Sequence, residues 1–375
     1  MKLYLKGHTE RYPVEQLQMQ LFGSLTSEFS ATPPRKDEDG AVSALSDGKR
    51  FRTATAVITL GGRTARAARR IPLAQADVRM TRRILQQSYY LAAVQLLPET
   101  PPWGALSGVR PTKLSTKCLM EGGTRKQADR MLRNIYFVTP ARRTLCLDAS
   151  EATVAAANKL APRDLSVYIG IPFCPTRCAY CSFVSESVER FGEFLPPYLD
   201  CLLREVEYTG NLLRNAGWHI RSLYMGGGTP TTLSSAQMAR LLEAIHTHFD
   251  LSRCLEFTVE GGRPDTLDEE KLRVIYQGGA TRISINPQTM SDRVLRAVGR
   301  RHTAAQTVAA YETARRIGFD DINMDLIAGL PADTAESFAD SVRQVTSMSP
   351  SGITVHTLAL KKGADLFQKR VTLPS

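Results

Sequence analysis

The sequence predicts an α/β protein in which a partial (βα)6 barrel follows a smaller, basic α+β domain. Two observations predict this fold class. From residue 165 onward, strand-like and helix-like stretches alternate six times, as in a parallel sheet with helical crossovers. Before residue 150 the pattern is less regular and the chain is markedly basic. We therefore expect a basic N-terminal domain of residues 1–150 and a barrel domain of residues 165–375.

Composition narrows the class of protein. The 375 residues are 43% hydrophobic and 23% charged, as in ordinary globular proteins. No apolar stretch approaches the ~20 residues that a membrane-spanning helix needs, and the apolar run at the start is too short for a secretory signal. The expected location is cytoplasmic, with no membrane partner. Thiols stay reduced in the cytoplasm, so clustered cysteines there indicate a metal site rather than disulfides.

The net positive charge of the chain comes entirely from residues 1–150. Residues 1–150 hold 24 Lys and Arg against 12 Asp and Glu, a net charge of +12, whereas the other 225 residues hold 24 against 25. A basic domain can attract RNA, anionic lipid or a polyanionic small molecule. A solvated surface that keeps the protein in solution explains the charge equally well.

Hydrophobic periodicity places the elements of the first domain. Alternating residues predict strands at Lys2–Lys6, Arg52–Leu60 and Thr64–Ile71, the last two joined by a Gly-Gly turn. Helical spacing covers Val14–Phe22, Val78–Leu97 and Thr124–Tyr136. Residues 37–40 are predicted to form a loop, and Ala149–Asp164 is predicted to lead out of the domain.

The second domain is a regular series of strands and helices. Its expected strands are Ser166–Phe173, Ser222–Met225, Leu255–Val259, Arg282–Ile285, Ile322–Ile327 and Ile353–Leu360. Its expected helices are Leu195–Ala216, Ser235–His248, Leu267–Gln277, Asp292–Val298, Ala304–Ile317 and Thr334–Met348. Six strands make a partial barrel, and the functional residues of such folds gather at the C-terminal ends of the strands.

Three of the seven cysteines, Cys174, Cys178 and Cys181, lie within eight residues directly after the first expected barrel strand. Thiolates suit an iron–sulfur cluster or zinc. A structural zinc site needs a fourth Cys or His nearby, and none follows at the usual spacing. Three ligands to a four-iron cluster leave one iron open, where an amine and a carboxylate can bind. The scattered cysteines are expected to be small buried side chains: Cys118, Cys146, Cys201 and Cys254.

A glycine-rich segment and an acid end the next two strands. Gly226–Pro230 ends the second strand, and glycines there let a ligand approach the backbone closely. Glu260 ends the third strand, where it could bind a ribose hydroxyl or an ammonium group. Its other possible roles are a helix cap or an ion pair with Arg263.

Polar residues also occur at the later strands. Gln288 follows the fourth strand, and Asp325 interrupts the apolar fifth strand. A buried charge is costly unless it is paired, so Asp325 needs a partner. Arg300 is the candidate partner, or alternatively a clamp for the carboxylate of a ligand.

The cysteine spacing, Cys174-Pro-Thr-Arg-Cys178-Ala-Tyr-Cys181, resembles the CxxxCxΦC signature of radical S-adenosylmethionine (SAM) enzymes, in which Φ is aromatic. The resemblance implies a [4Fe–4S] cluster held by Cys174, Cys178 and Cys181. It also implies SAM as a cofactor, which the cluster splits by donating an electron, giving methionine and a radical that abstracts hydrogen. Gly226–Pro230 resembles the family segment that contacts the methionine part of SAM.

Within that superfamily the sequence resembles oxygen-independent coproporphyrinogen III oxidases, most of all the HemZ type of coproporphyrinogen dehydrogenase. The segments that carry the resemblance are Trp103–Lys113, Ser166–Cys174, Gly226–Pro230, Gln288, Asp325–Pro331 and Ile353–Leu358. The implied activity is an oxidative decarboxylation in haem biosynthesis, which converts two propionates of coproporphyrinogen III to vinyl groups and gives protoporphyrinogen IX. The implied partners are a tetrapyrrole substrate and an electron donor such as flavodoxin or ferredoxin.

The resemblance also assigns cofactor-binding residues one by one. Tyr168, Gly227 and Glu260 match positions that contact the cluster-bound SAM. Positions around a second SAM are matched by Gly228, Thr229, Gln288, Arg300, Asp325 and Ala359. No catalytic residue is assigned.

Two features depart from the oxidases. Gly170 stands where the characterised oxidases commonly carry His. The chain also ends soon after the sixth strand, so the C-terminal region that follows the barrel in these proteins is expected to be missing.

Two alternative functions stay open. One is a haem chaperone, since close relatives of the oxidases resemble haem carriers, and His302 or His356 would then supply an axial ligand. The other is an RNA-modifying radical enzyme, suggested by the basic first domain, in which the arginines of residues 63–70 form the densest cluster. No aromatic residues alternate with these arginines, so base stacking is not indicated and nucleic acid is the less favoured partner.

Overall fold

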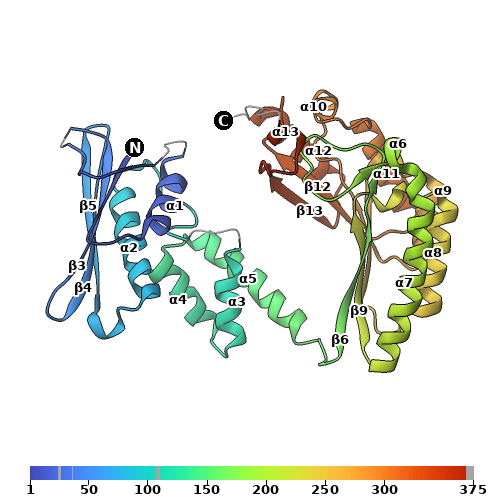
Figure 1. The fold of residues 1–375 in the computed structure, drawn as a ribbon, viewed down its shortest axis with the longest axis horizontal. Coiled ribbons are helices and arrows are strands. Elements are labelled where there is room, and N and C mark those ends of the chain that lie inside the picture. The colour runs from blue at the N-terminus through green and yellow to red at the C-terminus, as the bar shows by residue number, and fades with distance from the viewer. Residues whose placement is uncertain (24–26, 36, 107–109, 369–375) are drawn as a thin grey trace. The chain divides into compact units, whose positions relative to one another are not determined.

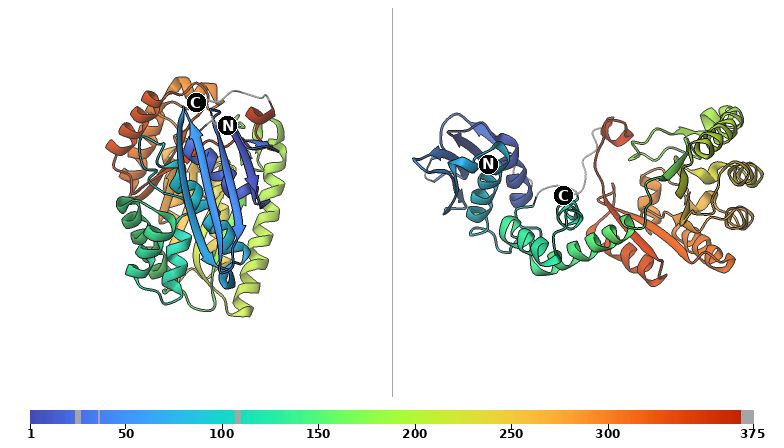
Figure 2. Two further views of the ribbon diagram at one scale, coloured as in Figure 1. Left: turned by 90° about the vertical axis from the view of Figure 1, so that its left-hand side faces the viewer. Right: turned by 90° about the horizontal axis from the view of Figure 1, so that it is seen from below.

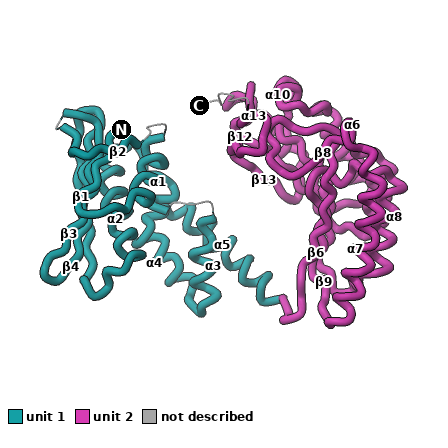
Figure 3. Tube along the Cα trace, viewed as in Figure 1, with its two compact units in different colours: residues 1–159 teal, residues 160–375 magenta. Residues whose placement is uncertain are grey.

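The computed structural model describes residues 1–23, 27–35, 37–106 and 110–368 (Figure 1). The chain divides into two compact units, Met1–Lys159 and Leu160–Ser375, each with its own hydrophobic core (Figure 3). Residues 107–109 of the segment Trp103–Lys113 lie outside the described residues.

Unit 1 begins with a five-stranded sheet that carries two helices on one face (Figure 2). Its strands, in the sheet order β2-β1-β3-β4-β5, are β2 (Glu28–Ser30), β1 (Lys2–Lys6), β3 (Gly40–Asp47), β4 (Phe51–Leu60) and β5 (Arg63–Pro72). β1 is parallel to β2 and β3, and the other pairs are antiparallel. α1 (Arg11–Phe22) and α2 (Val78–Ala93) pack on this sheet around the fully buried Leu3, Leu17 and Tyr89.

Three further helices complete unit 1: α3 (Thr112–Met120), α4 (Arg125–Tyr136) and α5 (Pro140–Ala157). A capping box of Thr124 and Gln127 begins α4, and Pro140 occupies the first turn of α5, where its missing N–H costs nothing. These helices enclose a second small core around Leu132 and Cys146.

The sequence patterns missed four elements of unit 1, namely β2, β3, α3 and α5. The segment Ala149–Asp164, predicted to lead out of the domain, instead begins with the second half of α5. This helix buries only Cys146, Leu147 and Ser150, so its apolar spacing is weak. The domain end predicted at residue 150 falls inside α5, and the compact unit ends at Lys159.

Unit 2 contains a six-stranded parallel sheet in which each strand lies beside the next strand of the chain. The order is β6 (Asp164–Ile171), β9 (His219–Gly227), β10 (Glu256–Gly262), β11 (Arg282–Ile285), β12 (Asp321–Ala328) and β13 (Gly352–Thr357). Among the described residues β6 and β13 do not pair, so the sheet stays open. This arrangement is the predicted partial (βα)6 barrel.

Helices connect successive strands of unit 2 (Figure 1). The main ones are α7 (Leu195–Ala216), α8 (Ser235–His248), α9 (Glu269–Gln277), α10 (Asp292–Ala297), α11 (Ala304–Ile317) and α12 (Ala335–Ser347). Shorter elements are β7 (Phe173–Cys174), β8 (Glu186–Ser187), α6 (Val188–Phe191) and α13 (Asp365–Gln368). In the described part of the chain, no helix combines the length and the apolar character needed to cross a bilayer.

The two faces of the unit 2 sheet differ in chemistry because successive side chains of a strand point to opposite faces. One set of alternate residues is apolar and buried in the core: Ile169, Met225, Val259, Ile283 and Met324. The other set lines a cavity: Tyr224, Thr258, Glu260, Ser284, Asn323 and Asp325. The fold therefore brings polar residues of four different strands together on one face.

Candidate functional site

A cavity of ≈ 570 Å³ lies at the C-terminal ends of the strands of unit 2. It is lined by most of the residues predicted to bind cofactors: Cys174, Cys178, Cys181, Gly227, Gly228, Thr229, Glu260, Gln288, Arg300, Asp325 and Ala359. Tyr168 is not among the lining residues. It is 61% exposed, and its ring stacks on that of Tyr224, which does line the cavity, with 5.9 Å between centroids.

Cys174, Cys178 and Cys181 are free, partly buried thiols in the segment that begins at β7. Burial raises the pKa of the Cys181 thiol, and the neighbouring Cys178 and Cys174 raise it further. The three sulfur atoms thus lie within electrostatic reach of one another. Arg300 and Tyr180 both interact with the Cys178 thiol.

The chemistry of these donors fits a cluster. Within the described residues, no three His, Cys, Asp or Glu side chains are arranged to hold one metal ion. A zinc ion needs ligands that converge on one point, whereas a four-iron cluster is bound by each thiolate at a different iron. Three neighbouring thiols on one loop fit a cluster that each thiolate binds at a different iron.

The remaining cysteines are more varied than predicted. Cys146 is buried, and Cys118 and Cys254 are partly buried. The prediction was wrong for Cys201, which is exposed on α7. It follows the buried Leu199 by two positions, and a step of two places a residue near the opposite side of a helix.

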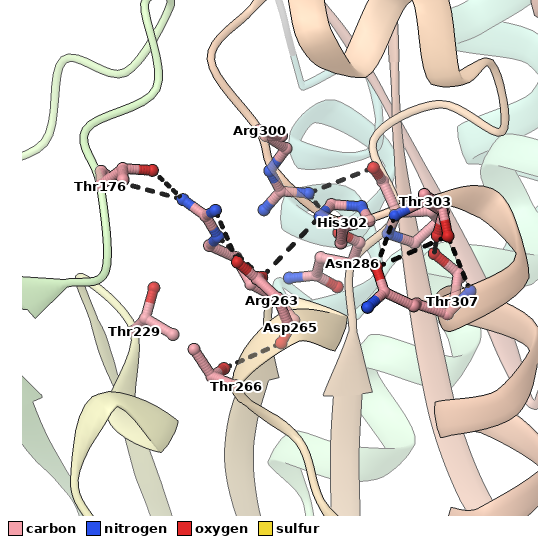
Figure 4. A network of polar contacts seen from close by, with 12 residues as sticks. Thr176, Thr229, Arg263, Asp265, Thr266, Asn286, Arg300, His302, Thr303 and Thr307 are labelled. Atoms are coloured by element: carbon pink, nitrogen blue, oxygen red, sulfur yellow. Dashed lines mark hydrogen bonds and ion pairs between the residues drawn. The ribbon is translucent and has the colours of Figure 1, made fainter.

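The loop that carries the three cysteines, residues 174–181, is anchored to the ends of other elements (Figure 4). The Thr229 hydroxyl donates a hydrogen bond to Cys174 Sγ at 3.4 Å. Arg263 Nη1 donates to the main-chain oxygen of Thr176 at 3.2 Å and to its Oγ1 at 2.6 Å. The Ala179 N–H donates to the carbonyl of Val298 at 3.0 Å. Contacts from several different elements therefore position the thiols.

The segment Gly226–Pro230 lies tightly against the start of the cysteine loop. Gly228 N–H donates to the carbonyl of Ile171, and Thr229 N–H donates to that of Phe173, both at 2.8 Å. A Cβ on Gly228 would lie 2.6 Å from the Phe173 oxygen, so a larger residue does not fit there without a shift. This narrow cradle leaves backbone at the cavity wall, as the close approach of a ligand requires.

Glu260 is a half-buried acid near the end of β10. Burial raises its pKa, a hydrogen bond from the Tyr224 hydroxyl at 2.6 Å opposes that rise, and the nearby Asp325 adds to it. The possible ion pair of Glu260 with Arg263 does not form. A register shift after Glu260 interrupts the strand alternation, and Arg263 pairs instead with Asp265, with 2.8 Å from Nη2 to Oδ2.

Of the two roles expected of Arg300, the pairing with Asp325 does not form among the described residues. Arg300 is 6% exposed, and its Nη1 donates to the carbonyls of Asn286 and Pro287 at 2.5 and 3.1 Å. Asp325 faces the cavity and accepts a 2.7 Å hydrogen bond from Asn323, so the carboxylate is not buried in the apolar layer. Successive side chains of β12 point to opposite faces of the sheet, and Asp325 lies on the face that lines the cavity.

Two buried polar atoms at the cavity have no partner among the described residues: Gln288 Oε1 and Arg300 Nε. Gln288 also has a positive φ of 69°, which strains a residue with a side chain. Buried polar groups are normally hydrogen-bonded, and exceptions often mark a ligand site. These atoms therefore fit a polar ligand such as SAM.

Several cavity residues were missed in the sequence: Arg177, Tyr224, Thr258, Arg282, Asn286, Asn323, Thr354 and Lys361. The strand periodicity of the sequence could have indicated two of these residues. Thr258 and Asn323 stand two positions before Glu260 and Asp325, which puts each pair on the same face of a strand.

Comparison with known proteins identifies the class. Residues 168–345 match the family described as the Radical SAM superfamily. The chain therefore carries a radical SAM domain, and this superfamily uses a [4Fe–4S] cluster and SAM.

Within the superfamily, the chain is homologous to the coproporphyrinogen III oxidase group. The oxygen-independent coproporphyrinogen-III oxidase-like protein HemZ of Bacillus subtilis is 37% identical over 274 residues, or 72% of this chain and 55% of the relative. The heme chaperone HemW of the same organism is 34% identical over 214 residues, or 56% of this chain and 55% of the relative.

A solved structure supports the same grouping. Coproporphyrinogen III oxidase (HemN) from Escherichia coli, a radical SAM enzyme, gives a TM-score of 0.52 at 31% identity, over 60% of this chain and 52% of that chain. The chain thus spans about half the length of the relatives it matches. Their names include both an oxidase and a chaperone, so the finer activity of this chain does not follow from them.

Proposed function

We propose that this chain is a radical SAM oxidoreductase that decarboxylates coproporphyrinogen III without oxygen, giving protoporphyrinogen IX. The observation that carries the proposal is a single cavity that gathers three free thiols, a tight glycine cradle and the half-buried carboxylate of Glu260. The similarity to HemZ and HemN supports the choice of substrate.

In this proposal Cys174, Cys178 and Cys181 would hold the cluster through their thiolates, and SAM would bind beside it. When bound and reduced, the cluster supplies the electron that cleaves SAM and so leads to hydrogen abstraction. Gly227 offers backbone groups to the methionine part, and Glu260 accepts a hydrogen bond from a ribose hydroxyl or an ammonium group.

A second SAM would contact further lining residues of the same cavity. Among these are Gly228, Thr229 and Ala359, whose side chains are small or absent. The unpartnered Gln288 Oε1 and Arg300 Nε would bond to the ligand, and Asp325 would accept from its hydroxyl or ammonium groups.

The substrate step balances as follows. Each propionate loses a hydrogen atom from the carbon beside the pyrrole, then carbon dioxide and one electron, and becomes a vinyl group. An electron donor such as flavodoxin or ferredoxin supplies the reducing electron, and an acceptor takes the final one. Arg177, which donates a 2.8 Å hydrogen bond to the Gly363 carbonyl, and Lys361 line the cavity, and cations there suit a polycarboxylate.

The test is an anaerobic incubation of the reconstituted protein with SAM, a reductant and coproporphyrinogen III. We expect methionine, 5′-deoxyadenosine and a tetrapyrrole that has lost two carboxyl groups, detected by mass spectrometry. Cleavage of SAM without any vinyl product would rule out this substrate while leaving the radical SAM chemistry in place.

A haem chaperone is the second candidate, and His356 is the observation that favours it. Its side chain is 56% exposed and lines the cavity, whereas the side chain of His302 is fully buried and out of reach of a haem. A haem titration that shifts the Soret band in the wild type but not in His356→Ala would support the chaperone. No Soret shift in the wild type would remove this candidate.

A further inference from the structure

One buried charge has no role in the proposed function. Arg263 is 2% exposed and belongs to the largest fully buried side chains, yet it matches no predicted cofactor contact. Burying a guanidinium is costly unless its donors are satisfied by well-placed acceptors. The acceptors around Arg263 therefore show what this arginine does.

All three nitrogens of Arg263 donate hydrogen bonds, and they do so to two different segments (Figure 4). Nε and Nη2 donate to the two carboxylate oxygens of Asp265 at 3.0 and 2.8 Å, the two-pronged geometry of a strong pair. Nη1 donates to Thr176, at 2.6 Å to the hydroxyl and at 3.2 Å to the main-chain oxygen. Arg263 thus joins the region after β10 to the cysteine loop.

The hydrogen bond from Arg263 to Thr176 matters because of where Thr176 lies in the cysteine loop. Thr176 lies two residues after Cys174 and two before Cys178, in the middle of the span between the first two thiols. The bond joins the segment after β7 to the segment after β10, and its two residues are 87 apart in sequence. A fixed Thr176 limits the positions that both neighbouring thiols can take.

The surroundings keep the Arg263–Asp265 pair charged. Burial by itself raises the pKa of Asp265, but its hydrogen bonds and charge interaction with Arg263 outweigh burial, and the pKa is lowered. His302 lies 3.9 Å from the same carboxylate, and burial together with Arg300 lowers its pKa to about 4, so the ring is neutral near pH 7. A neutral His302 does not compete with Arg263 for the Asp265 carboxylate, so Asp265 can orient Arg263.

We propose that Arg263 is a positioning residue for the cluster: oriented by Asp265, it fixes Thr176 and so holds the loop from Cys174 to Cys178 in the geometry that the cluster needs. This inference rests on the proposed cluster site. A cluster bound through three thiolates depends on a single loop, because all three ligands lie within eight residues. Restricting that loop before the cluster binds lowers the entropy lost on binding.

A purely structural ion pair does not account for these contacts. An ion pair that only shaped the turn after β10 would need Asp265 alone, and Nη1 would have no reason to reach Thr176. Lysine cannot substitute, because a single ammonium group lacks the planar fork that serves Asp265 and Thr176 together. Arg263→Lys therefore keeps the charge and removes the geometry.

The first measurement follows iron release from the reconstituted protein to a chelator under anaerobic conditions. Arg263→Lys should release iron about tenfold faster or more, since it loses charge-assisted hydrogen bonds to the loop. Thr176→Val, which keeps only the main-chain acceptor, should show a smaller increase, and Thr176→Ser should behave as the wild type. Arg282→Gln is the matched control, because Arg282 lines the same cavity but pairs with Glu256 and Asp321, which lie outside the loop. Wild-type iron release by Arg263→Lys would overturn the proposal.

The second measurement needs no cluster. Hydrogen–deuterium exchange of the metal-free protein compares a peptide covering residues 173–183 with one covering α8. We expect faster exchange of the loop peptide in Arg263→Lys, with α8 unchanged. Unchanged exchange of the loop would contradict the proposal. Should both peptides exchange faster, the variant has lost its fold, and Thr176→Val then decides in its place. If the wild type takes up no cluster, the proposed function fails while this result still decides the role of Arg263.

Discussion

Both Arg300 and Tyr180 interact with the Cys178 sulfur. We predict that Cys178→Ser abolishes cluster assembly, since a hydroxyl is a poor iron ligand and two thiols remain. Iron, acid-labile sulfide and visible absorbance after anaerobic reconstitution measure the effect.

The matched control for this prediction is Cys201→Ser, which changes an exposed thiol on α7 outside the loop. It should keep the iron content of the wild type. Equal iron contents in Cys178→Ser and Cys201→Ser would show that the loop does not bind the metal.

Glu260 has opposite effects on stability and on cofactor binding. Burial raises its pKa, so the folded chain binds this proton more tightly than the unfolded chain does. The resulting stability is complete below the pKa of the unfolded chain and is lost as the pH rises through the raised pKa of the folded chain. We predict that Glu260→Gln, which cannot ionise, gains free energy of unfolding relative to the wild type between about pH 5 and about pH 8. Urea unfolding of the metal-free proteins at both pH values measures this gain.

The same substitution should weaken SAM binding, because a neutral amide is a poorer acceptor for an ammonium or hydroxyl group than a carboxylate. Glu243→Gln on α8 changes an exposed acid and should show neither effect. A stability difference between Glu260→Gln and the wild type that does not vary with pH would contradict the raised pKa of Glu260.

Among the elements, long amphipathic helices were predicted well and weakly patterned ones were not. α7, α8 and α11 have the predicted bounds, and a capping box begins both α8 and α11. β3 and α5 were missed because small and polar residues blur their apolar spacing. The strand series of unit 2 was clear, since its apolar core residues recur in short stretches that alternate with helical patterns.

The site was predictable in part for a related reason. Motif spacing after strand ends indicated the loop and the glycine cradle, because the ends of parallel strands meet at one edge. Pairings between side chains were not predictable. They depend on which face each residue occupies, and the register shift after Glu260 is invisible in the sequence. The resemblance supplied the roles of single residues, and the contacts of Arg263 were found only in three dimensions.

The segment after β9 should tolerate no side chain at position 228. A Cβ there would lie 2.6 Å from the Phe173 oxygen and 2.9 Å from the Ile171 oxygen, both of them main-chain atoms that cannot turn away. We predict that Gly228→Ala costs about 1–3 kcal/mol of stability, as overpacking typically does, and lowers iron uptake. Thermal unfolding and iron analysis measure the two effects.

Gly170 on β6 is the matched control, since a Cβ there would meet only the ring of Tyr168, at 3.5 Å. Gly170→Ala should unfold like the wild type and take up as much iron. A Gly228→Ala protein as stable as Gly170→Ala would show that the cradle is looser than its geometry implies.

The whole molecule divides into units that should fold separately, because each has its own core. We predict that a fragment of residues 1–159 unfolds cooperatively and at a higher temperature than a fragment of residues 1–150. The shorter fragment cuts α5 and removes the ion pair between Arg125 and Glu151. Circular dichroism on heating measures both midpoints, and equal midpoints would favour the boundary at residue 150.

The exposed charges and the buried charges of the chain should respond differently to dissolved salt. Exposed charges are screened over a Debye length of ~10 Å at 0.1 M salt, whereas buried groups such as Arg263 and Arg300 are shielded from dissolved ions. The excess of +12 in residues 1–150 should therefore make any capture of a polyanion sensitive to ionic strength. SAM cleavage in the absence of substrate should be insensitive, so titrating salt distinguishes recognition from chemistry without altering a single residue.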